Sequence, residues 1–407
     1  MIKQFKKGKK NLYNFSLTYI ILLSNKHILK KDNIKNQKYK YNLIFNKNYN
    51  RRTYNTIKII CIKSIAVIII IFCFIIINKN KINRIQEFYQ KIFYKNTGDI
   101  FNFSLKYDEY NETIDKNYKY LQNYFCDKPN ENLNEEIENK IKKAKIDFKG
   151  QKFEMFVYKF DDIVSNSIIV NHQYEGNYVN KFLNALQFYS QKKKLDNKQI
   201  YFIDVGANIG CHSFLIGKHG YNVLSFEANK INNYILYKNF CLNKDVNLTI
   251  INKGLDEEEK ICKLKISPKN KGDGAIFCDN REQAYEYFSG EVYNNIELTT
   301  LSKYIKFLSK KNVALMKIDA EGYEGKIIKG GKEIIMDYHI PFIMFEFSVR
   351  LFKFHRTDIL EFLTFLKDNG YKFSSIDFFS KKNISPEELI KYNNPINLFV
   401  VYEKFIE

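Results

Sequence analysis

The sequence predicts an α/β fold with a doubly wound parallel sheet, and three observations carry this prediction. From about residue 150 of the 407, short apolar runs alternate with segments of helical spacing. The runs are apolar throughout, as is typical of strands that are covered on both faces. Polar residues and glycines follow the runs directly, where the carboxyl ends of parallel strands would bring them together. Right-handed crossovers between such strands give a doubly wound sheet.

The expected elements alternate along the chain. The first three strands are expected at Ile200–Val205, Asn222–Phe226 and Val246–Asn252, with a helix up to His219 and another at Asn229–Asn243. A less regular insert follows. Two further strands are expected at Val313–Ile318 and Pro341–Phe347, joined by a helix through Asp337. The last elements are a helix at Thr357–Asp368 and strands at Tyr371–Asp377 and Ile396–Tyr402.

The N-terminal part predicts a membrane anchor. Residues 59–77 are apolar except for Lys63, and as a helix they would span about 28 Å, close to the hydrocarbon thickness of a bilayer. Residues 1–58 carry 15 Lys and Arg against one acid, whereas the rest of the chain carries 50 against 44. We therefore expect a basic cytosolic tail at 1–58, a transmembrane helix at 59–77, a stem at 78–150 and a catalytic domain at 151–407.

The charge asymmetry across the span predicts the cytosol for the N-terminus and the lumen of the endoplasmic reticulum or Golgi for the domain. Asn102 and Asn111 begin glycosylation sequons on the expected stem, which agrees with that orientation. Leu12–Leu23 faintly resembles the apolar core of a signal peptide. The seven cysteines form no C-x-x-C pair, which argues against a zinc site; one disulfide would be compatible with a lumenal domain.

A glycine turn and an acid after the first two strands predict a nucleoside-containing cofactor. Gly206 would allow a tight turn after the first strand, and Gly210 a close approach of backbone and ligand. The G-x-x-x-G spacing is not the G-x-G-x-x-G pattern of dinucleotide enzymes, which disfavours a nicotinamide oxidoreductase. Glu227 ends the second strand, where a carboxylate would accept hydrogen bonds from both ribose hydroxyls.

Three acids are expected at one rim of the sheet. Asp319 and Glu321 follow the fourth strand, and Glu346 lies at the end of the fifth. Such carboxylates raise one another's pKa, which suits a general base or a cation-binding site. For the nearby Glu324 a helix-capping role is expected instead. No metal ligand set is assigned.

These motifs, in this order, resemble the FkbM-type methyltransferases. The resemblance rests on DVGANIG, FEAN, KIDAEGYE, Gly330-Gly331 and PFIMFE, and on a lead-in element that ends in Tyr174-Glu175. It covers about residues 150–350. It implies a Rossmann-like class I methyltransferase sheet, S-adenosylmethionine as methyl donor, and O-methylation of a hydroxyl on a sugar or small molecule.

The resemblance also implies residue roles. Donor-binding positions would be Asp204, Gly206, Asn208, Gly210, Glu227 and Glu175. Asp319 and Glu321 would face the transferring methyl, with Asp319 as the first candidate for the base. His212 and His355 are alternatives for that role.

The predicted function is a single-pass, membrane-anchored methyltransferase. Alternatives are a cytosol-facing enzyme that methylates a lipid or protein, and a catalytically silent binding protein that keeps the fold. The expected partners are a hydroxyl-bearing small molecule or glycan and the membrane. No nucleic acid is expected, because the catalytic half is near charge balance.

Overall fold

The computed structural model describes residues 113–128, 134–160, 162–267, 270–272, 274–278 and 292–407. The predicted basic tail, the transmembrane helix at 59–77 and the sequons at Asn102 and Asn111 lie outside these residues. Within the described ranges, no helix combines the length and the apolar character needed to cross a membrane.

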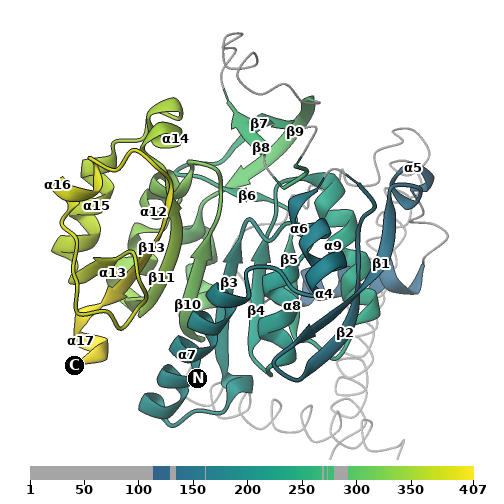
Figure 1. The fold of residues 1–407 in the computed structure, drawn as a ribbon, viewed down its shortest axis with the longest axis horizontal. Coiled ribbons are helices and arrows are strands. Elements are labelled where there is room, and N and C mark those ends of the chain that lie inside the picture. Colours follow the sequence, from purple (N-terminus) through teal and green to yellow (C-terminus); the bar gives the residue numbers. More distant parts are fainter. Residues whose placement is uncertain (1–112, 129–133, 161, 268–269, 273, 279–291) are drawn as a thin grey trace, which may run out of the picture. The chain divides into compact units, whose positions relative to one another are not determined.

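A seven-stranded sheet forms the centre of the described part (Figure 1), and its strands run in the order β12-β13-β11-β10-β3-β4-β5. The strands are β3 (Ile200–Val205), β4 (Asn222–Phe226), β5 (Leu248–Ile251), β10 (Asn312–Ile318), β11 (Phe342–Phe347), β12 (Tyr371–Ser374) and β13 (Ile396–Tyr402). β3 pairs in parallel with both β4 and β10. The strand order therefore reverses between β3 and β10, where ligands of doubly wound sheets bind.

One strand departs from the predicted parallel sheet. β13 pairs antiparallel with both β11 and β12. Because an antiparallel neighbour needs no crossover helix, the chain can return from β12 and insert its last strand between β12 and β11.

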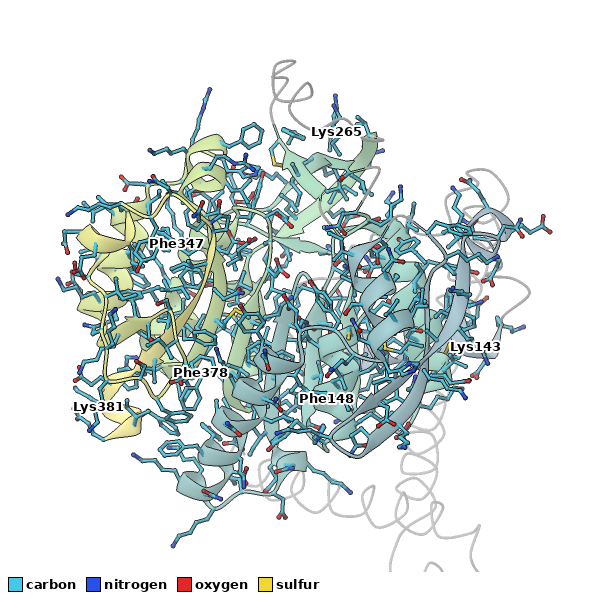
Figure 2. The ribbon with its side chains drawn as sticks, in the orientation of Figure 1. Lys143, Phe148, Lys265, Phe347, Phe378 and Lys381 are labelled. Carbon is cyan, nitrogen blue, oxygen red and sulfur yellow. A yellow bond between two sulfur atoms is a disulfide. The ribbon has the colours of Figure 1, made fainter. Side chains whose placement is uncertain are left out.

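Helices cover both faces of the sheet, as the apolar runs predict. One face packs on α7 (Gly176–Lys193), α8 (Cys211–Lys218) and α9 (Lys230–Leu242), and the other on α12 (Glu324–Gly330), α13 (Lys332–Tyr338) and α15 (Ile359–Asp368). Along β11, Phe342 and Met344 belong to the first core, whereas Ile343, Phe345 and Phe347 belong to the second. Figure 2 shows Phe347 at the carboxyl end of β11 and Phe378, which contacts Phe342, nearer its amino end.

The helix expected through Asp337 is two helices. α12 ends at Gly330 and α13 begins at Lys332. A Cβ at Gly330 would lie 2.0 Å from the carbonyl oxygen of Asp256, so the backbone of the insert approaches the helix at this point. α14 (Val349–Phe354), α16 (Pro386–Leu389) and α17 (Glu403–Ile406) complete the C-terminal part.

The insert after β5 is regular, contrary to expectation. It forms a four-stranded sheet in the order β6-β9-β7-β8. The strands are β6 (Gly254–Leu255), β7 (Lys260–Ile266), β8 (Gly274–Phe277) and β9 (Val292–Thr299), followed by a 3₁₀ helix at Leu301–Tyr304 and α11 (Ile305–Leu308). In Figure 1 this sheet lies above the carboxyl ends of the central strands.

The residues N-terminal to 151 take part in the fold from Thr113 onward. The charged run at 134–145 is helical only in α5 (Glu135–Glu138) and continues as β1 (Ile141–Phe148), which pairs with β2 (Gln151–Tyr158). α4 (Thr113–Asp127) covers the edge strand β5 through Gln122. The Gln122 amide donates to Leu248 O at 2.9 Å and accepts from Ile250 N at 3.1 Å, as a neighbouring strand would.

Two disulfides are present among the described residues, where the sequence suggested at most one. Cys126–Cys241 joins α4 to α9, and Cys262–Cys278 joins β7 to the residue after β8. Cys211 is buried with a free thiol. The first bridge ties α4 to the α/β part, whereas the second lies within the insert sheet.

Candidate active site

The turn after β3 meets the end of β10. Gly206 has φ +72°, and a Cβ on it would lie 1.9 Å from the carbonyl oxygen of Asp319. Asp319 N also donates to Val205 O at 3.0 Å. Only glycine fits this backbone crossing, because any side chain would overlap the chain that follows β10.

Glu227 supports the glycine turn from below. Its two carboxylate oxygens each accept a 2.7 Å hydrogen bond from a backbone N–H, one from Asn208 and one from Asn229. Burial raises the pKa of Glu227 to about 7, although both N–H donors favour the charged form. Each oxygen keeps a second lone pair for a further donor. The acid that the sequence places after the second strand therefore lies directly against the turn.

Lys317 links the acids of β3 and β10, and sequence analysis assigned it no role. Its ammonium is 3.2 Å from Asp319 Oδ2, 3.6 Å from Asp204 Oδ1, and donates to Gly206 O at 3.3 Å. Burial alone would lower the pKa of Lys317, but Asp319, Asp204 and Glu175 raise it well above its ordinary value. A lysine in the otherwise apolar run VALMKI was the signal that could have revealed it.

Asp204 lies fully buried beneath the turn. Ser213 on α8 donates to Asp204 Oδ2 at 2.5 Å and also pairs with Ser225 on β4 at 2.7 Å. The side chain therefore joins the turn to α8 and the sheet. Asn208 has φ +53°, and its buried Oδ1 has no hydrogen-bond partner among the described residues.

The three acids predicted at the rim lie together. The carboxylate oxygens of Asp319, Glu321 and Glu346 fall within 4.8 Å of one another, and all three residues are half-buried. Oxygen ligands of this kind suit a hard divalent cation. However, Lys317 already places a positive charge beside Asp319, so the cluster has an internal counter-ion.

Glu324 does not cap α12 as expected: Tyr323 is the N-cap, without a side-chain capping bond, and Glu324 binds the preceding loop instead. Its Oε1 accepts from Ala320 N at 2.9 Å, which holds the loop between β10 and α12. Burial raises its pKa to about 8, and the nearby charges of Glu346 and Asp319 add to that shift.

Glu175 and His212 form a second pair beside the turn. Glu175 Oε2 lies 3.3 Å from His212 Nε2. Burial opposes the charged form of Glu175, but the contact with His212 outweighs it and the pKa of Glu175 is lowered. His212 is buried against the rings of Tyr174 and Phe182, so packing accounts for much of its position. The positive charge of Lys317 also lowers the pKa of Glu175, so this pair lies near the acids of the rim.

The insert sheet contacts both loops of the site, which sequence analysis did not anticipate. Tyr323 Oη donates to Ile276 O on β8 at 3.2 Å and lies 3.5 Å from Cys278 Sγ. A Cβ on Gly272 would lie 2.4 Å from Asn208 Nδ2. His355, the other histidine considered, is buried edge-on to the Tyr323 ring at 4.6 Å.

Comparison with known families agrees with this geometry. Residues 204–373 match the sequence profile described as the methyltransferase FkbM domain, a range that contains the glycine turn, Glu227 and the acid rim. Residues 204–373 form an FkbM-type methyltransferase domain. The domain is accordingly that of an S-adenosylmethionine-dependent methyltransferase. A comparison with curated proteins found no match.

Solved structures with some similarity include several methyltransferases. A precorrin-6y C5,15-methyltransferase from Geobacter metallireducens shares 11% identity at TM-score 0.28, covering 54% of this chain and 88% of its own. The bifunctional kinase-methyltransferase WbdD shares 9% at TM-score 0.34, covering 56% and 40%. An S-adenosylmethionine-dependent methyltransferase from Agrobacterium tumefaciens shares 9% at TM-score 0.33, covering 64% and 70%. Similarities this distant add no argument about this chain.

The contact between Gly206 and Asp319 gives a stability prediction. Gly206→Ala should lower the free energy of unfolding by about 1–2 kcal/mol for left-handed strain and by a further ~1–3 kcal/mol for the overlap. Gly150→Ala is the matched control, since Gly150 has φ +78° but open space around it. Denaturant unfolding of both variants measures the difference. Equal losses would show that the backbone crossing at Gly206 is not as close as described.

Proposed function

We propose that this methyltransferase is anchored in a membrane and transfers the methyl group of S-adenosylmethionine to a hydroxyl of a glycan or small molecule. The observation that carries the proposal is the position of Asp319. Its carboxylate is 41% exposed at the rim, while its backbone touches the glycine turn that Glu227 supports. The proposed proton acceptor therefore lies in a loop whose backbone contacts the turn proposed to bind the nucleoside.

The residues of the turn fit the donor. The carboxylate of Glu227 would accept the ribose hydroxyls with its remaining lone pairs, and the unpaired Oδ1 of Asn208 offers a further acceptor. Gly206 and Gly210 leave the turn without side chains, while Asp204 fixes it to α8. Glu175, held by His212, would provide a carboxylate on the far side. When bound, the donor supplies a methyl group that a nucleophilic oxygen can accept in one displacement.

Asp319 would take the proton from the acceptor. A hydroxyl oxygen that forms a bond to the methyl carbon must lose its proton, and a positioned carboxylate can receive it. Lys317 holds one oxygen of Asp319 in place, and Glu321 and Glu346 lie beside it at the rim. His212 is less suited to this role, because it is buried against aromatic rings.

The location proposed is the lumenal side of the endoplasmic reticulum or Golgi membrane. The surplus of positive charge ahead of residue 59 supports a cytosolic N-terminus. The two disulfides add independent support, since such bridges persist in oxidising compartments and are rare in the cytosol.

Incubation of the full-length protein with radiolabelled donor and separated glycan, small-molecule, lipid and protein fractions tests the acceptor class. Label in the glycan or small-molecule fraction supports the proposal. Label confined to lipid or protein would favour a different acceptor, and donor binding without transfer to any fraction would favour a silent binding protein.

Asp319→Asn should separate chemistry from binding. The amide keeps the size of the side chain but cannot take the proton, so turnover should fall by about 10²–10⁴ while donor affinity changes by only a few fold. Asp147→Asn is a matched control, because Asp147 is a half-exposed acid paired with Lys152 at 2.9 Å. A normal turnover per folded molecule in Asp319→Asn, with a lower melting temperature, would assign Asp319 a structural role.

Donor affinity should depend on pH through Glu227. The pKa of about 7 lies above the ordinary carboxyl value, so the neutral form is favoured and any stability it adds is lost as pH rises from about 4.5 through 7. Ribose binding needs the carboxylate, so affinity should rise up to tenfold per pH unit below 7 and level off above it. Calorimetry from pH 5.5 to 8.5 measures this. Glu227→Gln should bind weakly at every pH, and a flat wild-type profile would exclude Glu227 as the titrating group.

Protease treatment of sealed microsomes tests the orientation. The domain after residue 113 should survive intact until detergent is added, and Asn102 or Asn111 should carry glycan. Digestion of the domain in sealed vesicles would place it in the cytosol.

A further inference from the structure

A cavity lies at the amino ends of the central strands, far from the acid rim at their carboxyl ends. Its volume is about 260 Å³. It is enclosed by the end of α7, the segment before β10, the end of α13 and the C-terminal α17. In Figure 1 the end of α7 and α17 lie on the lower side of the sheet, opposite the insert sheet. The methyltransferase chemistry proposed above does not use this cavity.

Two lysines at the cavity have no acidic partner among the described residues. Lys193 Nζ lies 5.7 Å from the centre of the Phe405 ring, and Lys311 Nζ lies about as close to the rings of Tyr201 and Phe307, at 5.2 and 5.1 Å. Neither ammonium forms an ion pair in this part of the chain. By contrast, the adjacent Lys192 donates to Phe405 O at 2.6 Å. Lys193 is exposed and Lys311 half-buried, so two positive charges without acidic partners among the described residues border the cavity.

His339 adds a polar atom without a partner. The residue ends α13 in the left-handed region at φ +44°, and its ring stacks on Tyr402 with centroids 4.3 Å apart and planes at 3°. Its Nδ1 is buried with no hydrogen-bond partner in the described structure. A buried polar atom of this kind is costly unless a ligand or water completes it.

The rest of the lining is apolar and aromatic. Leu308, Ile334 and Phe405 are buried, whereas Tyr338 is exposed and Tyr402 half-buried. The volume lies just below the usual range of small-ligand pockets, roughly 300–1,000 Å³. We propose that this cavity binds a small anion that carries an apolar, flat body, with its charge held by Lys193 and Lys311 and its body against the aromatic lining.

Calorimetry on the purified full-length chain tests the site with three probes that divide the ligand into parts. Phenyl phosphate supplies the anion and the ring, inorganic phosphate supplies the anion alone, and phenol supplies the ring alone. Phenyl phosphate should bind with one site per chain and at least tenfold tighter than either part. Equal affinity for inorganic phosphate, or no saturable binding of phenyl phosphate, would overturn the proposal.

Charge-matched variants identify where the probe binds. The double variant Lys193→Gln, Lys311→Gln should bind phenyl phosphate at least tenfold more weakly. Its affinity for S-adenosylmethionine should be unchanged, which also shows that the domain is folded. Lys194→Gln with Lys198→Gln removes the same charge from exposed lysines outside the cavity and should have little effect. Equal losses of phenyl phosphate affinity in the two double variants would indicate general attraction to a basic surface and would overturn the proposed site.

The same anion chemistry could come from a soluble metabolite or from a lipid headgroup. Monomeric dihexanoyl phosphatidic acid, titrated beside phenyl phosphate, distinguishes these sources. Tighter, Lys311-dependent binding of the lipid identifies a headgroup, and tighter binding of phenyl phosphate identifies a soluble ligand. Either result supports the site. Failure of phenyl phosphate to bind would refute the site whatever the lipid does, without bearing on the methyltransferase function.

Discussion

The carboxyl edge of the central sheet is organised around the buried ammonium of Lys317. It contacts Asp204 on β3, Asp319 after β10 and the carbonyl of Gly206 in the turn between them. A charge buried with such partners contributes little net stability, but removing one partner leaves the others uncompensated and costs roughly 3–5 kcal/mol. The network therefore acts less as a source of stability than as a device that fixes two strand ends in one arrangement. The positions of the glycine turn and of the rim acids depend on it.

Around this network the carboxyl groups fall into two kinds. Glu227 and Glu324 are buried, each binds backbone N–H groups, and burial raises the pKa of both. They shape the loops on either side of the sheet edge. Asp319, Glu321 and Glu346 are half-buried at the rim and remain accessible to an acceptor. Glu175, Asn208 and Glu321 all adopt positive φ without being glycines. Such strain is retained where surrounding contacts fix the backbone, as is common around functional sites.

Much of the central sheet could be predicted from the sequence, because its strands are short, continuous apolar runs. Those at Ile200–Val205, Asn222–Phe226 and Ile396–Tyr402 occur at the predicted residues. The antiparallel direction of β13 and the four-stranded insert could not be read from local pattern, since both depend on pairing between distant segments. The same holds for Gln122 at the sheet edge and for the disulfide between Cys126 and Cys241. Lys317 was visible as an exception to an apolar run, but its partners come from three separate segments.

The two ends of the sheet also differ in how they can bind charge. Strand carboxyl ends lead into helix N-termini, where backbone N–H groups and the helix dipole favour anions. The cavity at the opposite end faces helix C-termini: Lys193 is the last residue of α7 and His339 directly follows α13. Cations are favoured at such ends, and Lys193 occupies one of them. Backbone groups at such ends are acceptors, so they would repel an anion. An anion in this cavity must therefore be bound by side chains alone. At the donor site, by contrast, both backbone groups and the Glu227 carboxylate would contact the ligand.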